Sequence, residues 1–311
     1  MRKLAALLFS LLALPALAQP SLKMMIPANP GGGWDQTGRS LAAAMQSAKL
    51  VSSVQFDNKG GAAGIIGLAQ FVNSAKGDPS AVMMGGMVMV GGIILGKSAV
   101  NLSQVTPIAR LTSEWEVIVV PAASPIKSMA DLVKMLKDNP GKVSWGGGSA
   151  GGTDHILAGL IAKAVGVDAA RVNYVPYKGG GEAIAAILGG HVTVGVSGIG
   201  EFAEQVKAGK MRALAVSAPS KTDGIASLKE QGIDVELGNW RGIFAGPGIT
   251  PQQRDALVKL VKDATETPSW KATLEKLGWT PVFLGGDDYK KFIDEDIKRV
   301  SAIIDSLGLK K

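Results

Sequence analysis

Four glycine-rich segments contain the residues best suited to binding chemistry. They occupy 30–35, 58–64, 146–153 and 177–181, and each lies between a strand-like apolar run and a helix-like run. A helix N-terminus leaves about four backbone N–H groups without partners inside the helix, and the helix dipole places partial positive charge there. Glycine has no Cβ, so a ligand can approach this backbone closely. The pattern therefore predicts sites for a small anion.

Several side chains near these loops permit two interpretations each. Asp35 either caps the helix that follows it, which we favour, or orients the first loop. His155, in the first turn of a predicted helix, either donates to a ligand or packs. The dipeptide Tyr177-Lys178 lies on a loop expected to face the ligand. Trp34 either forms a pocket wall or packs between lobes, and Trp240-Arg241 either lines a cleft or braces a hinge.

The third glycine segment also matches two enzyme motifs. Its Gly-x-Gly-x-x-Gly spacing from Gly146 is typical of dinucleotide binding, but the next strand ends at Pro176 where that fold needs an acid. The Gly-x-Ser-x-Gly spacing around Ser149 is typical of a hydrolase nucleophile. Only His191 follows it, at the start of a predicted strand, where a catalytic histidine is not expected. Both enzyme hypotheses therefore lack a required partner.

Apolar strands alternate with helical stretches along the chain. We predict strands at 24–27, 51–56, 81–84, 115–120, 142–145, 172–175, 192–196, 212–216 and 281–284. We predict helices at 37–49, 65–75, 128–137, 154–165, 182–188 and 201–208, a loop and a short helix before 95, and two helices within 251–307. This alternation predicts an α/β fold with a largely parallel sheet.

Two segments containing proline and serine, 121–125 and 217–220, are interpreted as crossings between two lobes. Residues 19–122 and 219–311 then form lobe 1, and residues 123–218 form lobe 2. The alternative is that both segments are ordinary turns within one large sheet.

The N-terminus has the features of an export signal. Met1-Arg2-Lys3 precedes an apolar run from Leu4 to Leu17, and Ala16-Leu17-Ala18 is a small-x-small cleavage site. We expect residues 1–18 to be removed after Ala18. The remaining 293 residues suit about two domains of ~150 residues each. The alternative is a buried N-terminal helix.

Composition excludes several classes of function. The chain has no cysteine and only two histidines, so we expect no disulfide, no metal site and no cofactor. The net charge of +7 falls to +5 once Arg2 and Lys3 are removed. The remaining basic residues are scattered, which argues against nucleic-acid binding, whereas their surplus helps to attract an anion. No stretch after the leader is apolar and long enough to span a bilayer.

The sequence resembles the solute receptors of tripartite tricarboxylate transporters, the Bug family, over essentially the whole mature chain. The resemblance is carried by Ile26-Pro27-Ala28-Asn29-Pro30-Gly31-Gly32-Gly33-Trp34-Asp35, 60–64, 147–155, Val175-Pro176-Tyr177-Lys178-Gly179-Gly180 and Asn239-Trp240-Arg241-Gly242. It implies a type II periplasmic binding protein, with two α/β lobes that close on a ligand in the cleft between them. It also implies delivery of the ligand to integral membrane transporter subunits. We expect a monomer.

Family ligands are mostly carboxylates, held by the first loop and by the facing loop of lobe 2, partly through water. Carried over to this sequence, the family pattern implies that residues 32–35 bind the ligand on one side of the cleft and residues 149–153 bind it on the other. The loops and the resemblance together predict these ligand-binding residues: Asn29, Gly32, Gly33, Trp34, Asp35, Gly61, Ala62, Ser149, Ala150, Gly151, Gly152, Thr153, His155, Tyr177, Lys178 and Trp240.

The function expected from these residues is a non-enzymatic periplasmic receptor for a di- or tricarboxylate. Gly-Gly-Gly-Trp-Asp at 31–35 looks most like the citrate-binding receptors, so a citrate-like ligand is expected. The segment 218–223 lacks a proline-rich stretch that many members have, which leaves the hinge contacts open. The alternatives are an exported serine hydrolase that uses Ser149 and a periplasmic carboxylate sensor that feeds a signalling kinase.

Overall fold

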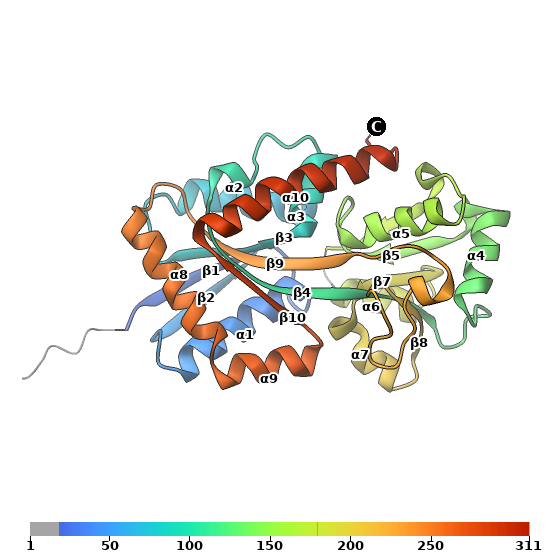
Figure 1. The fold of residues 1–311 in the computed structure, drawn as a ribbon, viewed down its shortest axis with the longest axis horizontal. Helices are drawn as coiled ribbons and strands as arrows, with labels where there is room; N and C mark the ends of the chain where they lie inside the picture. The colour runs from blue at the N-terminus through green and yellow to red at the C-terminus, as the bar shows by residue number, and fades with distance from the viewer. Residues whose placement is uncertain (1–18, 179, 311) are drawn as a thin grey trace, which may run out of the picture.

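The computed structural model describes residues 19–178 and 180–310. The predicted signal peptide, 1–18, lies outside the described residues. Figure 1 shows two groups of elements side by side, each with helices packed against strands. This arrangement confirms the predicted two-lobed α/β fold.

The first group, at the left of Figure 1, combines elements from both ends of the described chain. These are β1 (Ser21–Ile26), α1 (Gly33–Ser47), β2 (Ser53–Asn58), α2 (Ile65–Ser74), β3 (Ala81–Gly86), α3 (Met87–Leu95), α8 (Pro251–Thr265), α9 (Pro268–Leu277), β10 (Thr280–Gly285) and α10 (Gly286–Ser306). The second group holds α4 (Met129–Asp138), β5 (Ser144–Gly147), α5 (Thr153–Ala164), β6 (Asn173–Pro176), α6 (Gly180–Leu188), β7 (Val194–Gly198), α7 (Ile199–Lys207) and β8 (Met211–Val216). Most bounds lie within a few residues of the predicted ones. The exception is the region before β10, where two helices, α8 and α9, replace the single predicted helix because the helix is interrupted at Thr267-Pro268.

One long strand, β4 (Thr106–Pro121), runs from the first group into the second, and β9 (Gly238–Ala245) lies beside its first part. Up to Trp115, β4 pairs with β9 and β10. From Glu116 onward it pairs with β7 and β8. This change of partners comes before the predicted crossing at 121–125, and the lobe boundaries stay a prediction.

The sheet is mixed, which corrects the prediction of a largely parallel sheet. Its order is β2-β1-β3-β9-β4-β7-β5-β6, with β8 and β10 also paired to β4. Among the described strands, four pairs are parallel and five are antiparallel. Every antiparallel pair includes β4 or β9, because these two strands run against the parallel β-α-β units on either side.

Strand β9 was not predicted, and neither was the first half of β4. Glycine and asparagine at 238–239 and glycine at 242 disfavour a strand locally. From Asn239 onward, however, every residue of β9 is buried. Tertiary packing between β3 and β4 therefore overrides the local preference.

Two predicted features of helix N-termini are confirmed, the capping box at Ser128 and the first-turn proline at Pro251. The Ser128 hydroxyl accepts the N–H of Asp131, and the backbone N–H of Ser128 donates to the Asp131 carboxylate, which completes the predicted capping box of α4. Pro251 occupies the first turn of α8, behind the capping side chain of Thr250. These local bonds set the directions in which the helices leave their loops.

The two groups share more than β4. One buried apolar cluster includes Met24 of β1 and Trp145 of β5. Helix α10 extends along both groups in Figure 1, and Lys163 of α5 donates to the carbonyl of Ser306 at its end (3.4 Å). No helix within 19–178 and 180–310 is long and apolar enough to cross a membrane.

Candidate functional site

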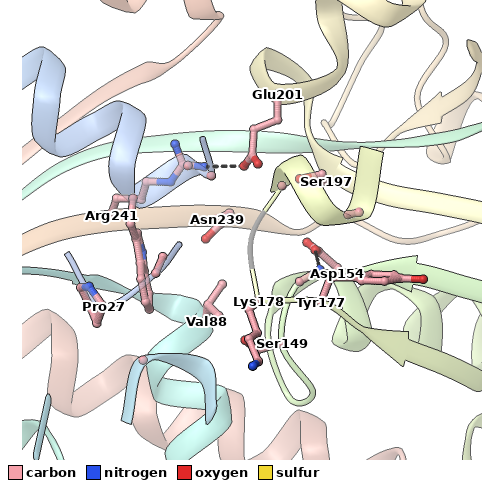
Figure 2. Close-up of a pocket in the computed structure, with 18 of the residues that line it drawn as sticks. Pro27, Val88, Ser149, Asp154, Tyr177, Lys178, Ser197, Glu201, Asn239 and Arg241 are labelled. Atoms are coloured by element: carbon pink, nitrogen blue, oxygen red, sulfur yellow. Dashed lines mark hydrogen bonds and ion pairs between the residues drawn. The ribbon is translucent and has the colours of Figure 1, made fainter. Parts of the chain in front are cut away.

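The four glycine loops meet at one pocket between the two groups of elements. They follow the carboxyl ends of β1, β2, β5 and β6, which is where ligands bind in open α/β sheets. Figure 2 shows the side chains that surround the pocket. Its lining residues are Pro27, Ala28, Gly32, Gly33, Trp34, Gly61, Gly64, Val88, Gly148, Ser149, Asp154, Tyr177, Lys178, Gly180, Ala183, Ser197, Glu201, Asn239 and Arg241.

Some N–H groups of these loops already bind carboxylates of the chain itself. Gly31 donates to Asp35 Oδ2 (3.1 Å), and Gly148 donates to Asp154 Oδ2 (2.5 Å). In the fourth loop, Glu182 Oε2 accepts a backbone N–H at 3.1 Å. Each of these acids belongs to the first turn of the helix that follows its loop. Three of the four loops therefore donate backbone N–H groups to carboxylates of the chain itself, and binding of an external anion stays a prediction.

A buried arginine joins the elements around the pocket. Arg241 of β9 forms an ion pair with Glu114 of β4 and contacts Glu201 of α7 at 3.5 Å. Its Nη1 also donates to Thr37 of α1 (3.2 Å). Burial lowers the pKa of Arg241 to about 9, so the side chain stays cationic at neutral pH. A Cβ at Gly33 would overlap the guanidinium, so this close approach requires glycine.

Buried acids lie on the same side of the pocket. Burial, with the charges of Asp154 and Glu201, raises the pKa of Glu116 well above its ordinary value. Burial raises the pKa of Asp154 to about 6. Burial, followed by the charge of Asp154, raises the pKa of Glu201 to about 8. At neutral pH, Asp154 is therefore mainly ionised and Glu201 mainly protonated. Burial favours the neutral form of Glu116, and Arg241 is paired with Glu114.

The sequence-based prediction missed most of this polar side. Glu114 and Glu116 alternate within an otherwise apolar run, which places them on one face of a strand. Asn239 and Arg241 show the same alternation in β9, with Trp240 facing the other way. Charged residues inside apolar runs were the available signal, but only the sheet pairing shows that the two strands bring them together.

Seven of the predicted ligand-binding residues line the pocket: Gly32, Gly33, Trp34, Gly61, Ser149, Tyr177 and Lys178. Two more, Ala62 and Ala150, line a neighbouring hollow that shares Ser149, Tyr177 and Lys178 with it. Trp34 is buried at the pocket edge, close to Gly64 of the second loop. That these nine residues bind a ligand stays a prediction.

The family model TctC, described as "Tripartite tricarboxylate transporter family receptor", matches residues 38–309. The chain belongs to this family. The "UPF0065 protein in gbd 5'region" of Cupriavidus necator is 30% identical to this TctC-family receptor over 97% of the chain and 93% of the relative.

Solved structures share the fold of the TctC-family receptor. The periplasmic binding protein BugD is 23% identical, with a TM-score of 0.83 over 94% of this chain and 99% of BugD. A Rhodopseudomonas palustris protein with adipate is 20% identical, with a TM-score of 0.82 over 93% and 97% of the two chains. MatC of the same organism, with bound malate, is 20% identical, with a TM-score of 0.78 over 94% and 100%.

Four predicted residues of the TctC-family receptor lie outside the described pocket lining. Asp35 does not cap α1; hydrogen bonds from Arg39, Asn58 and Gly31 outweigh its burial and lower the pKa of its carboxyl. The favoured capping interpretation is therefore wrong, and Asp35 orients the first loop. The remaining three are Gly151, Gly152 and Thr153, at the start of α5.

Three further predicted residues contact other side chains of the protein instead of lining the pocket. These are His155, Asn29 and Trp240. His155 stacks on Tyr174 (4.4 Å between ring centroids) and accepts the N–H of Gly151, and burial lowers its pKa to about 4. Asn29 donates to Glu182 of α6 (2.8 Å). Trp240 donates to Asp296 of α10 (2.8 Å) and braces β9, whereas its neighbour Arg241 lines the pocket.

The described lining gives no support to the enzyme alternatives. Ser149 lines the pocket, but neither His155 nor His191 is among the residues that surround it. Nor does any described group of His, Asp or Glu side chains have the arrangement needed to hold a metal ion.

Proposed function

We propose that this TctC-family receptor captures a small carboxylate in the pocket where the four glycine loops meet. The observation that carries the proposal is that loops from both groups of elements direct backbone N–H groups to carboxylates of the chain itself. The same local geometry suits a carboxylate on a ligand. Hydrogen bonds to charged groups contribute about 1.5–3 kcal/mol each, so several of them reach the ~8 kcal/mol of micromolar binding.

Structures with the same fold support this ligand class. One contains adipate and another malate, and both are small dicarboxylates. The pocket of this chain offers the hydroxyl of Ser149 and the ammonium group of Lys178 on one side, with Trp34 as an apolar wall. The citrate-like ligand expected from 31–35 is less well supported, because buried acids on the other side oppose a trianion.

Isothermal titration of the mature chain, 19–311, tests the proposal. Malate, succinate, adipate, citrate, aspartate and glutamate form the panel, and the dimethyl ester of succinate is the uncharged control. We expect saturable binding of at least one acid below millimolar concentration and no binding of the ester. If no carboxylate binds at millimolar concentration, the proposal is wrong.

Binding without turnover distinguishes the receptor from a hydrolase. In the Ser149→Ala variant, a receptor keeps its affinity within a few-fold, because the hydroxyl contributes one hydrogen bond among several. A hydrolase that uses Ser149 loses its turnover completely. Measuring ester hydrolysis and carboxylate affinity on the same preparation separates the two.

Export and delivery complete the proposed function. We expect the protein to be recovered from the periplasm with Gln19 as its first residue, and to be monomeric in solution. Lobe 1 would comprise 19–122 and 219–311, and lobe 2 would comprise 123–218. Cross-linking in membranes should capture integral transporter subunits; capture of a sensor kinase alone would instead favour signalling.

A further inference from the structure

Oxygen atoms from four nearly buried side chains form one side of the pocket. The exposed fractions are 7% for Asp154, 6% for Ser197, 6% for Asn239 and, for its side chain, 8% for Glu201. Figure 2 shows Glu201 at the top, Ser197 and Asp154 at the right and Asn239 left of centre, with Lys178 and Ser149 below them. The pocket thus has an acceptor side and a donor side.

One acceptor on this side lacks a partner. Asn239 Oδ1 is buried, and among the described residues nothing donates a hydrogen bond to it. Leaving a buried polar atom unsatisfied costs about 1–3 kcal/mol. Because Asn239 lines the pocket, a hydrogen-bond donor of the ligand can satisfy this oxygen.

The charge on the acceptor side is unbalanced too. Arg241 is already neutralised by Glu114, with Glu201 as its second contact. The hydrogen bonds to Asp154 come from the backbone N–H of Gly148 and from the side chain of Glu116, and neither brings a positive charge. A buried carboxylate without a cation is unfavourable, so one positive charge placed here stabilises the complex.

A protonated amine fits these features better than a metal ion does. The described acids do not form an arrangement that could hold a metal. An ammonium group instead donates three hydrogen bonds to acceptors around it. Asp154, Glu201 and Asn239 supply such acceptors, and Asp154 supplies the opposite charge.

We propose that the ligand is an amino-carboxylate whose ammonium group binds among Asp154, Glu201 and Asn239. Its carboxylate lies on the opposite side, against the loop N–H groups, Ser149 and Lys178. This inference rests on the proposed carboxylate-binding function and narrows the ligand to a zwitterion. A polyanion such as citrate gains nothing from the acceptor side, which the amine of an amino acid matches in charge and hydrogen bonding.

The structural roles of these acids do not account for the whole arrangement. Asp154 orders the third loop through Gly148, and Glu201 contacts Arg241. Neither role satisfies Asn239 Oδ1, and neither supplies a cation for Asp154. Burial, and after it the charge of Asp154, raises the pKa of Glu201 to about 8.

Matched ligand pairs test the proposal by titration calorimetry on the wild-type mature chain. Succinate, malate and aspartate share a carbon skeleton and differ in hydrogen, hydroxyl or ammonium at one carbon. Glutarate with glutamate, and butyrate with 4-aminobutyrate, cover longer skeletons and a terminal amine. N-acetylaspartate keeps both carboxylates of aspartate and removes the positive charge. We expect at least one amine to bind tenfold or more tightly than its amine-free partner, and acetylation to abolish this advantage.

Three outcomes have distinct meanings. A tenfold preference for an amine supports the proposal. If plain dicarboxylates bind as tightly as their amino counterparts, or more tightly, this inference is wrong while the carboxylate receptor stands. If no carboxylate of either kind binds, both proposals are wrong.

Charge-removing variants locate the amine. Asp154→Asn keeps an oxygen that can accept the Gly148 N–H, and we expect it to lower amine affinity tenfold or more without weakening the plain dicarboxylate. Glu201→Gln provides a second test should Asp154→Asn fold poorly, as judged by circular dichroism.

Glu182→Gln is the matched control, because Glu182 also accepts a loop N–H but lies outside the described lining. It should leave the ratio of amine to plain affinities unchanged; an equal change of that ratio in all three variants would overturn the assignment.

Discussion

At the scale of single residues, the pocket depends on one buried cation and the acids around it. Arg241 contacts side chains from three separate elements, and both Arg241 and Glu114 are almost fully buried. A buried charge whose partner is removed is strongly destabilising, whereas the intact pair adds little net stability. The ion pair therefore acts mainly to hold β9, β4 and α7 in one arrangement.

Replacing Arg241 tests this role. Arg241→Met leaves Glu114 buried without its cation, and we expect the free energy of unfolding to fall by about 3–5 kcal/mol. The double variant Arg241→Met with Glu114→Gln should recover part of this loss, because no unpaired charge remains. Urea denaturation of the single and double variants measures both effects. Equal losses in the two proteins would show that packing of the arginine, rather than its charge, is what matters.

The raised pKa values of the pocket acids predict how stability depends on pH. Between its ordinary value of 4.5 and about 8, Glu201 is protonated in the folded protein and ionised in the unfolded chain. The folded state then binds more protons, so the free energy of unfolding falls as pH rises, by up to ~1.4 kcal/mol per pH unit for this group. Asp154 adds to this fall between 3.8 and about 6.

Chemical denaturation at pH 5.5, 6.5 and 7.5 measures this slope without ligand. In Glu201→Gln the side chain no longer titrates, so the fall between pH 6.5 and 7.5 should become smaller. An unchanged slope in this variant would show that other groups control the pH dependence.

At the scale of elements, the glycines are placed for close approach between elements as well as for ligand access. Gly33 begins α1 directly against Arg241, and Gly180 begins α6 against the carboxylate of Glu201. Two loops from different groups therefore lie against the same Arg241–Glu201 contact. Their sequence pattern alone does not distinguish this packing role from ligand binding.

Alanine substitutions separate crowded from open glycines. Gly33→Ala places a Cβ on the Arg241 guanidinium, and overpacking of this kind costs about 1–3 kcal/mol. The matched control is Gly181→Ala in the first turn of α6, where a Cβ meets nothing within 4 Å. We expect the control to be as stable as wild type or more so, by up to ~1 kcal/mol, because alanine favours a helix. Thermal denaturation compares them; equal melting temperatures would contradict the crowding at Gly33.

At the scale of the whole molecule, shared elements connect the two groups. Strand β4 pairs within both groups, α10 reaches α5, and the exposed contact from Asn29 to Glu182 joins the first loop to α6. One buried apolar cluster contains side chains from both groups. These connections join the two groups through shared strands, hydrogen bonds and a common apolar core.

A single unfolding transition is therefore expected for the mature chain. Trp279, in the first group, and Trp145, in the second, are both buried and report on separate regions. Tryptophan fluorescence of the Trp279→Phe and Trp145→Phe variants and far-UV circular dichroism should give coincident urea transitions. Two separated transitions would show that the groups fold independently despite sharing β4.

The amino-acid sequence by itself determined the alternation of elements, the helix caps and the four anion-binding loops. These features depend on short-range patterns: Ser128 with Asp131, Thr250 with Pro251, and glycines between a strand and a helix. The family resemblance added the prediction of a two-lobed receptor. The four loops meet at one pocket, as a receptor of that kind requires. Seven of the residues predicted for the site line the pocket for this reason.

Only the tertiary structure decided which polar side chains face the ligand. Arg241 and Asn239 are distant in sequence from Asp154 and Glu201, and they meet because β9 pairs with β4 in a mixed sheet that local propensity did not indicate. Burial then changes the charge of these groups, since removal from water disfavours the ionised form of a carboxyl. The glycine pattern predicted a ligand site at these loops. The sheet pairing brought buried acids to the same pocket, and the proposed preference for a zwitterion rests on those acids.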